Sequence, residues 1–257
     1  MRKLIFYLPV FGLLFFCFNA NAQDVAIGVR GGISIPNLSA GGSEENPLNS
    51  GYSSRQGPDL GLFAEFKVSN LFSIEPMVQY SSQGGKKDGF QALPTPSALA
   101  AELQAYNQPV PTYMYATYNS QAKLNYLMIP VLAKFGWDLG KKSPWRLYVD
   151  AGPFAGFLLN AHQVITGSSI LYADQGKTHP ETPGPVPLDT VANIKSQLHT
   201  FNFGIEGNVG IAYKVGPGSI FVEGGGNYGF LNIQKGTANG KNNTGAGTAD
   251  LGYAFWF

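Results

Sequence analysis

Apolar residues alternate with small or polar residues along eight separate segments of the chain. In the first segment, "VAIGVRGGISIP" (25–36), valine and isoleucine fill most odd positions, whereas glycine, arginine and serine fill most even ones. A period of two residues predicts a β-strand with one apolar face. The same alternation recurs in "DLGLFAEFKV", "LFSIEPMVQYSS", "NYLMIPVLAKFGW", "WRLYVDAGPFAGFLL", "FNFGIEGNVGIAYKV", "IFVEGGGNYGFL" and "ADLGYAFWF". We therefore predict eight strands, each about as long as the 9–11 residues with which a tilted strand crosses a bilayer.

The connections between the predicted strands are alternately short and long. The short ones join strands 2 and 3, 4 and 5, and 6 and 7, at residues 69–70, 138–144 and 216–219. The long ones span residues 37–58, 84–122, 160–199 and 232–247. Short periplasmic turns, long extracellular loops and an even number of strands are typical of bacterial outer-membrane barrels.

These patterns predict an all-β fold, an eight-stranded antiparallel up-and-down transmembrane β-barrel with long extracellular loops. The interior of such a barrel is just wide enough for side chains, so small and charged residues face inward and large apolar residues face lipid. Aromatic residues near the strand ends fit interfacial girdles; these are Tyr80, Trp145, Tyr213, Tyr228 and Phe257. The alternative is an exported soluble sandwich or lipocalin-like barrel, in which the apolar faces would point into a core.

Residues 1–22 have the pattern of a secretory signal peptide. A short positive start is followed by an apolar run and by the small-x-small triplet "ANA", which ends at Ala22. The run is shorter than the ~20 residues of a spanning helix, which disfavours an uncleaved anchor. Cys17 follows two phenylalanines rather than small residues, so we do not expect lipidation. We predict cleavage near Ala22 and a barrel domain over residues 23–257.

Charged residues make up 13% of the chain and the net charge is +1, without an acidic or basic block. This composition argues against a nucleic-acid partner. Five cationic and six acidic residues fall on the inward side of the predicted strands: Arg30, Glu65, Lys67, Glu75, Lys134, Arg146, Asp150, Glu206, Lys214, Glu223 and Asp250. Because an unpaired buried charge is costly, we predict a polar network that fills the lumen. A proton or ion relay is the alternative, whereas an open pore is not expected in a barrel of this size.

Several segments together resemble the PorT-like (porin-like) outer-membrane β-barrel family of Gram-negative bacteria. They are "IGVRGGIS", "FSIEPMVQYSSQGGK", "LNYLMIPVLAKF", "YVDAGPFAGFLL", "FNFGIEGNVGIAYK", "NYGFLNI" and "GYAFWF". The resemblance implies an integral outer-membrane barrel surrounded by outer-membrane lipid. At Gly225 the chain departs from the family, whose members often carry a charged residue near this position. The family name refers to a secretion-associated member, which makes a component of a secretion or transport machinery one expectation.

The last segment, "ADLGYAFWF", raises the question of why aromatics should stand at this end of the sequence. In lipid the backbone groups must pair internally, so the last strand must close on the first. The alternating Tyr253, Phe255 and Phe257 also resemble the signal by which outer-membrane assembly machinery recognises its substrates, so this machinery is an expected partner.

The second long connection contains a predicted short helix and several tyrosines. The helix is expected from Ser97 to Tyr106, with Ser97 as its cap. The tyrosines are Tyr106, Tyr113, Tyr115 and Tyr118. Exposed tyrosines suit the binding of an extracellular protein or glycan ligand. Alternatively, strands 3 and 4 continue above the membrane and the tyrosines form an aromatic belt along them.

Catalysis is not expected. His162 and His199 fall at the extracellular ends of strands 5 and 6 and could approach each other beside Ser196, but no spacing motif marks a nucleophile and base. Metal-ligand spacing is absent too, and no cofactor is expected. The sequence therefore favours a structural or surface-interaction protein that binds ligands through its loops. The alternatives are the secretion role and, less favoured, a lipid-modifying enzyme.

Overall fold

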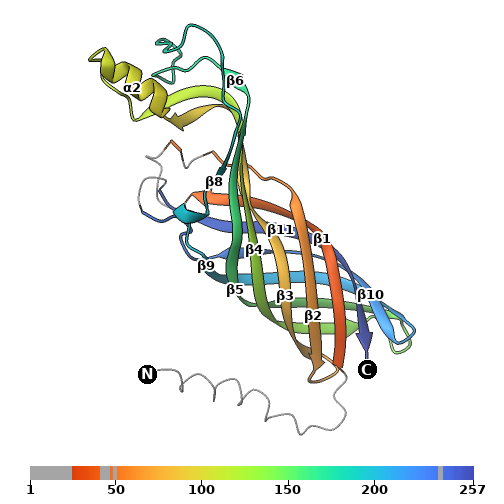
Figure 1. The fold of residues 1–257 in the computed structure, drawn as a ribbon. Coiled ribbons are helices and arrows are strands. Elements are labelled where there is room, and N and C mark those ends of the chain that lie inside the picture. The colour runs from red at the N-terminus through yellow and green to blue at the C-terminus, as the bar shows by residue number, and fades with distance from the viewer. Residues whose placement is uncertain (1–24, 41–46, 49–50, 237–239) are drawn as a thin grey trace, which may run out of the picture.

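The computed structural model describes residues 25–40, 47–48, 51–236 and 240–257. Eight long antiparallel strands form a closed ring in which each pairs with the strands before and after it (Figure 1). They are β1 (Val25–Ala40), β2 (Gly57–Lys67), β3 (Phe72–Pro94), β4 (Tyr113–Asp138), β5 (Trp145–Thr166), β9 (Phe201–Val215), β10 (Gly218–Gly229) and β11 (Asn242–Trp256). The predicted up-and-down barrel is confirmed. The predicted signal peptide and its cleavage site lie outside the described residues.

The ring closes between the first and last strands. β1 pairs with β11 from Ala26 opposite Trp256 to Ala40 opposite Asn242. Beyond this ladder, the backbone N–H of Phe257 donates a hydrogen bond to the carbonyl oxygen of Val25 at 2.9 Å. The aromatic end of the sequence is therefore part of the sheet, as backbone pairing in lipid requires.

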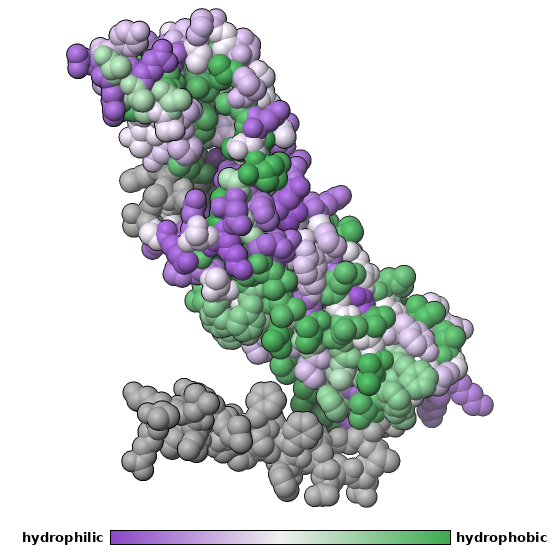
Figure 2. Space-filling view, viewed as in Figure 1, coloured by the Kyte–Doolittle hydropathy of each residue, from purple (hydrophilic) through white to green (hydrophobic). Residues whose placement is uncertain are grey.

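Large apolar side chains cover the outside of the lower part of the ring (Figure 2). Leu62, Val131 and Leu251 are 63%, 46% and 58% exposed. The residues directly before and after each of these three are buried, so the residues predicted to face inward and outward do so. The alternative of a soluble sandwich is wrong, because the apolar faces point away from one another and form a band suited to lipid.

Three strands continue beyond the ring and carry a separate folded region (Figure 1). β3 and β4 stay paired from Lys86 opposite Gln121 to Pro94 opposite Tyr113, and the helix α2 (Ser97–Ala105) joins them. The connection after β5 contributes β6 (Ser168–Ser169), β7 (Val186–Pro187), β8 (Thr190–Asn193) and the 3₁₀ turn η1 (Lys195–Gln197). We call residues 86–121 and 163–193 the outer body. The prediction of a loop over residues 84–122 is therefore wrong for most of its length, and the alternative of continuing strands describes it.

The outer body has its own apolar core. Met114, Ala116 and Leu171 are buried in it, and Leu99 of α2 packs against them. The predicted cap is wrong: Pro96 occupies the N-cap position and no side chain caps the helix. Ser97 is already helical, so its hydroxyl lies too far along the turn for that role. Among the described residues, no helix is long and apolar enough to cross a membrane.

Candidate functional site

A hydrogen-bonded cluster links β1, β5, β9 and β10 in the middle of the lumen. Arg30 on β1 donates from Nη2 to Glu206 Oε1 on β9 at 2.6 Å and from Nη1 to Glu223 Oε1 on β10 at 2.7 Å. Tyr148 donates its hydroxyl hydrogen to the other oxygen of Glu223 at 2.7 Å. All four side chains are buried. Charge-assisted hydrogen bonds of this kind are stronger than neutral ones and fix the relative positions of the strands.

A second ion cluster lies nearer the short turns. Lys134 Nζ lies 2.7 Å from Glu75 Oε2 and 3.1 Å from Glu65 Oε2. Ser73 donates to the other oxygen of Glu65 at 2.6 Å. Lys134 also lies 4.2 Å from the ring centroid of Tyr148, which is a cation–π contact. The two clusters therefore meet at Tyr148.

The interior contains a buried carboxylate that the sequence analysis missed. Asp59 is fully buried and accepts hydrogen bonds from Gln79 Nε2 at 2.7 Å and Ser81 Oγ at 2.8 Å. The parity of β2 could have revealed it, because Asp59 has the same inward phase as Glu65. Asp150 accepts from Asn208 Nδ2 at 2.8 Å.

Three of the five cations predicted to face the lumen lie at its mouth instead of in its interior. Lys67, Arg146 and Lys214 lie at the mouth beside the short turns, where together they line a cavity of about 370 Å³. Arg146 is bonded to Asp138 Oδ1 at 3.0 Å, and Lys214 is exposed. They lie outside the interior because they are the inward residues nearest the short turns, within reach of water. The described charges that are buried include seven carboxylates, Asp59, Glu65, Glu75, Asp150, Glu206, Glu223 and Asp250, and four cations, of which Arg30 and Lys134 belong to the lumen clusters, whereas Arg55 and Lys87 do not.

Aromatic side chains block the lumen on the same level as Lys134. Phe63 and Phe221 are buried with their ring centroids 5.8 Å apart. They fit because glycines stand opposite them: a Cβ on Gly28 would overlap the ring of Phe63, and a Cβ on Gly252 would overlap that of Phe221. Glycine here provides space for a ring in a narrow barrel.

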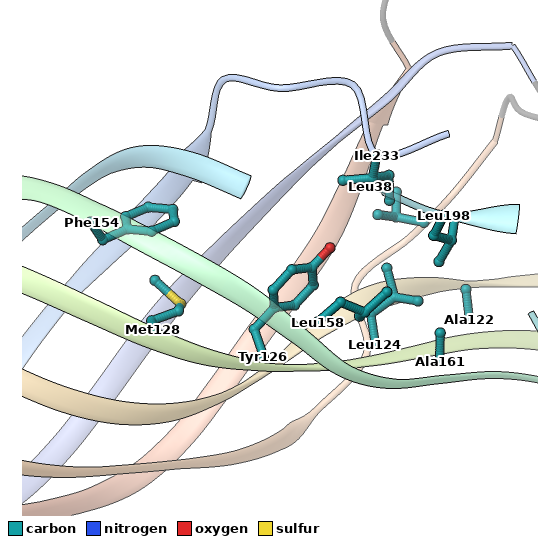
Figure 3. Close-up of a cluster of buried hydrophobic side chains, with 10 residues drawn as sticks. All are labelled: Leu38, Ala122, Leu124, Tyr126, Met128, Phe154, Leu158, Ala161, Leu198 and Ile233. Carbon is teal, nitrogen blue, oxygen red and sulfur yellow. The ribbon is translucent and has the colours of Figure 1, made fainter. Parts of the chain in front are cut away.

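A second apolar cluster closes the other end of the ring (Figure 3). Leu38, Leu198 and Ile233 gather opposite Leu124 in this cluster, which we call the upper plug. A cavity of about 250 Å³ lies between the upper plug and the outer body, since residues of both regions line it. Lys87 is the one charged side chain among the described residues that line this cavity.

The four predicted binding tyrosines do not form one cluster. Tyr106 is 73% exposed at the end of α2. Tyr113 and Tyr115 are half-buried, and the backbone of Tyr115 pairs with that of Tyr172. Tyr118 is buried, lines the 250 Å³ cavity and donates to the carbonyl oxygen of Ala92 at 2.6 Å. Burial raises the pKa of Tyr118 to about 12, so its hydroxyl remains protonated at neutral pH.

The histidines are not joined into a catalytic arrangement in the part of the chain that the structure describes. His162 pairs across the sheet with Lys123 and Asn193, and the backbone N–H of His199 donates to Ile233. His179 lies in a turn beside Asp174, whose pKa is lowered by the N–H groups of that turn. No group of three or more described His, Cys, Asp or Glu residues is arranged to hold a metal ion.

A closed ring with a lipid-facing apolar band, short turns at one end and extended strands at the other defines an outer-membrane β-barrel protein. Residues 21–235 match the family described as "Outer membrane protein beta-barrel domain", and the chain belongs to this family. The protein is accordingly an integral barrel of the Gram-negative outer membrane, in contact with its lipid. A search among curated proteins finds no match.

Solved structures with a similar fold include small outer-membrane barrels. Ail of Yersinia pestis, solved in complex with the heparin analogue sucrose octasulfate, is 9% identical, with 92% of this chain and 100% of Ail covered and a TM-score of 0.38. Neisserial surface protein A is 13% identical, with 90% and 99% covered and a TM-score of 0.36. OprG of Pseudomonas aeruginosa is 10% identical, with 92% and 98% covered and a TM-score of 0.39. Similarity at this level carries no argument about function.

Proposed function

We propose that this protein is a non-conducting outer-membrane barrel that binds an extracellular protein or glycan through its outer body. The observation that supports it is the contrast between a filled lumen and a folded outer body. Two apolar plugs and the charged clusters occupy the lumen, whereas β3, β4 and α2 build a cored region outside the membrane. A folded, solvent-exposed region offers a preorganised binding surface, which lowers the entropic cost of binding.

Removal of α2 tests the proposal without disturbing the ring. Pro94 and Tyr113 are paired neighbours, so residues 95–112 can be replaced by an Asn-Gly turn, which suits a two-residue hairpin. Wild-type protein and the variant, each in lipid nanodiscs, are compared on an array of extracellular glycans and matrix proteins. We expect ligands of the wild-type protein to be lost or weakened in the variant. Absence of any ligand for the wild-type protein, or equal binding by both, would overturn the proposal.

The closed lumen has a separate test in planar bilayers. Because aromatic and aliphatic side chains block the ring at two levels, we expect no steady conductance from the inserted protein. Replacement of Phe63 and Phe221 by glycine removes the two rings that block the lumen beside Lys134 and should leave the upper plug closed. A steady wild-type conductance would contradict the non-conducting part of the proposal.

Three further expectations from the sequence can be tested separately. Cleavage after Ala22 rests on the small-x-small triplet that ends there, and the mass of the mature protein should correspond to a start at Gln23. A non-enzymatic role predicts unchanged outer-membrane lipids when His162 and His199 are replaced by alanine. Membership of the PorT-like branch rests on the quoted segments, and a secretion complex recovered with the protein would favour that alternative role over surface binding.

A further inference from the structure

The cavity between the upper plug and the outer body has an apolar floor. Leu38, Leu124, Leu198 and Ile233 are buried side chains of the plug, and all four line the cavity. At about 250 Å³ it is smaller than the roughly 300–1,000 Å³ of pockets for drug-sized ligands. A cavity with such a floor favours a small apolar body.

One side of the same cavity carries a buried cation. Lys87 is 8% exposed, and its Nζ lies 3.1 Å from the carbonyl oxygen of Pro47 and 3.4 Å from that of Leu48. Its Nζ is also 5.5 Å from the ring centroid of Tyr52. No described carboxylate forms an ion pair with it, and no described acidic residue lines the cavity. Burial lowers the pKa of Lys87.

The neighbouring residue, Lys86, differs from Lys87 in its exposure and in its ion pairing. Its side chain is 40% exposed and pairs with Asp88 at 3.3 Å. Lys86 belongs to the outside of β3, whereas Lys87 belongs to the cavity. Lys87 is a buried cation without an ion-pair partner among the described residues, and an anion that reaches it would stabilise it, because charge-assisted hydrogen bonds are strong in a partly desolvated site.

We propose that this cavity binds a small amphipathic anion, with its acidic head group on Lys87 and its apolar chain on the upper plug. The inference deepens the proposed function, because it assigns a small-molecule ligand to the base of the same outer body. A short-chain or medium-chain carboxylate has this chemistry. A cation of the same length finds no acidic side chain among the described residues that line the cavity. A neutral alcohol can contact the apolar floor but forms no ion pair with Lys87.

Binding is measured by calorimetry on the full mature protein in lipid nanodiscs, with empty nanodiscs as the baseline for partition into lipid. The probes are decanoate, 1-decanol and decyltrimethylammonium. We expect saturable 1:1 binding of decanoate, weaker binding of decanol, and none of the cation above the baseline. Raising the pH should weaken decanoate binding, because deprotonation of Lys87 removes its charge. Since the pKa of Lys87 is lowered, binding should weaken at a lower pH than that at which an exposed lysine deprotonates.

Two variants and a matched control separate the cavity from the membrane. Lys87→Met should weaken decanoate binding at least about tenfold, whereas Lys86→Met should leave it unchanged. Ala122→Phe should abolish binding, because Ala122 is buried and lines the cavity. The heat-dependent shift of folded barrels in SDS gels confirms that each variant is folded.

Equal affinity of the wild-type protein and Lys87→Met, or decanoate uptake that does not exceed that of empty nanodiscs, would overturn the inference. If decanoate does not bind but binding of the array ligands still depends on α2, the inference about the cavity is wrong and the proposed function stands. If decanoate binds as expected but no array ligand depends on α2, the proposed function falls instead.

Discussion

The barrel and the outer body bury opposite kinds of side chain, although one strand runs through both. Along β4 the even-numbered residues are buried from Met114 to Lys134. Their odd-numbered neighbours change character midway: Asn119 and Lys123 are exposed and polar, whereas Ile129 and Val131 are exposed and apolar. The same alternate residues of β4 are buried in both regions. The medium around the strand, lipid or water, decides whether the outward residues are apolar or polar.

From the change in the outward residues we infer that the outer edge of the membrane lies between Asn125 and Leu127. A bulge in β5 falls at the same level, where the register between β4 and β5 shifts at Asn125 and Tyr126. Below the bulge Leu158 faces inward, and above it Ala161 does. A bulge changes the inward phase of a strand and increases its twist. Where the strands leave the barrel, the inward residues of β5 therefore change from even-numbered to odd-numbered positions. Beyond this point lies the outer body, which packs like a water-soluble domain.

The largest expected effect comes from removing the cation of the central lumen cluster. Arg30→Met leaves Glu206 and Glu223 buried without their partner, so we expect a loss of about 3–5 kcal/mol in the free energy of unfolding. Urea titration in lipid vesicles, followed by tryptophan fluorescence, measures it. Arg146→Met is the control: its ion pair with Asp138 is partly exposed, and such pairs contribute about 0–1 kcal/mol. Similar losses in both variants would show that the lumen is as well hydrated as the mouth.

A core substitution in the outer body should act locally. Met114 is fully buried, and Met114→Ala should destabilise the outer body by about 2–5 kcal/mol. Limited proteolysis should then cut within residues 86–121, while the barrel still shows its heat-dependent gel shift. Thr117→Ala on the exposed face of the same strand serves as the control. Simultaneous loss of the barrel would mean that the two regions fold as one unit.

A charge on the outward face of β4 distinguishes lipid from water directly. Val131→Arg should cost about 2–4 kcal/mol, because it places a cation in the apolar band. Asn119→Arg, on the same face of the same strand but in the outer body, should change stability by less than about 0.5 kcal/mol. Unfolding in vesicles gives both values, and equal costs would contradict the proposed position of the membrane edge.

The smallest expected effect on stability concerns Tyr106. Because 73% of this side chain is exposed, Tyr106→Ser should change the free energy of unfolding by less than about 0.5 kcal/mol. If the outer body binds through α2, the same substitution should weaken an array ligand. A change in stability with unaltered binding would assign Tyr106 a packing role instead.

Alternation along the chain was sufficient to predict the ring and the phase of its strands, because the bilayer allows only one side of each strand to be polar. It also identified the buried residues Arg30, Glu75 and Glu206. It did not reveal that Lys214 leaves the lumen or that Asp59 enters it, since these depend on where each strand ends relative to the mouth. The outer body was predicted as a loop because its outward residues are polar, which removes the contrast that marks a membrane strand.

The sequence by itself determined the membrane-facing surface, since contact with lipid constrains each strand separately and leaves a local pattern. Only the tertiary structure decided the ion partners of Arg30 and Lys134, the glycines that admit Phe63 and Phe221, and the cavity beside Lys87. These features join strands that are distant in the sequence, and their positions follow from register, from the β5 bulge and from the closure of the ring.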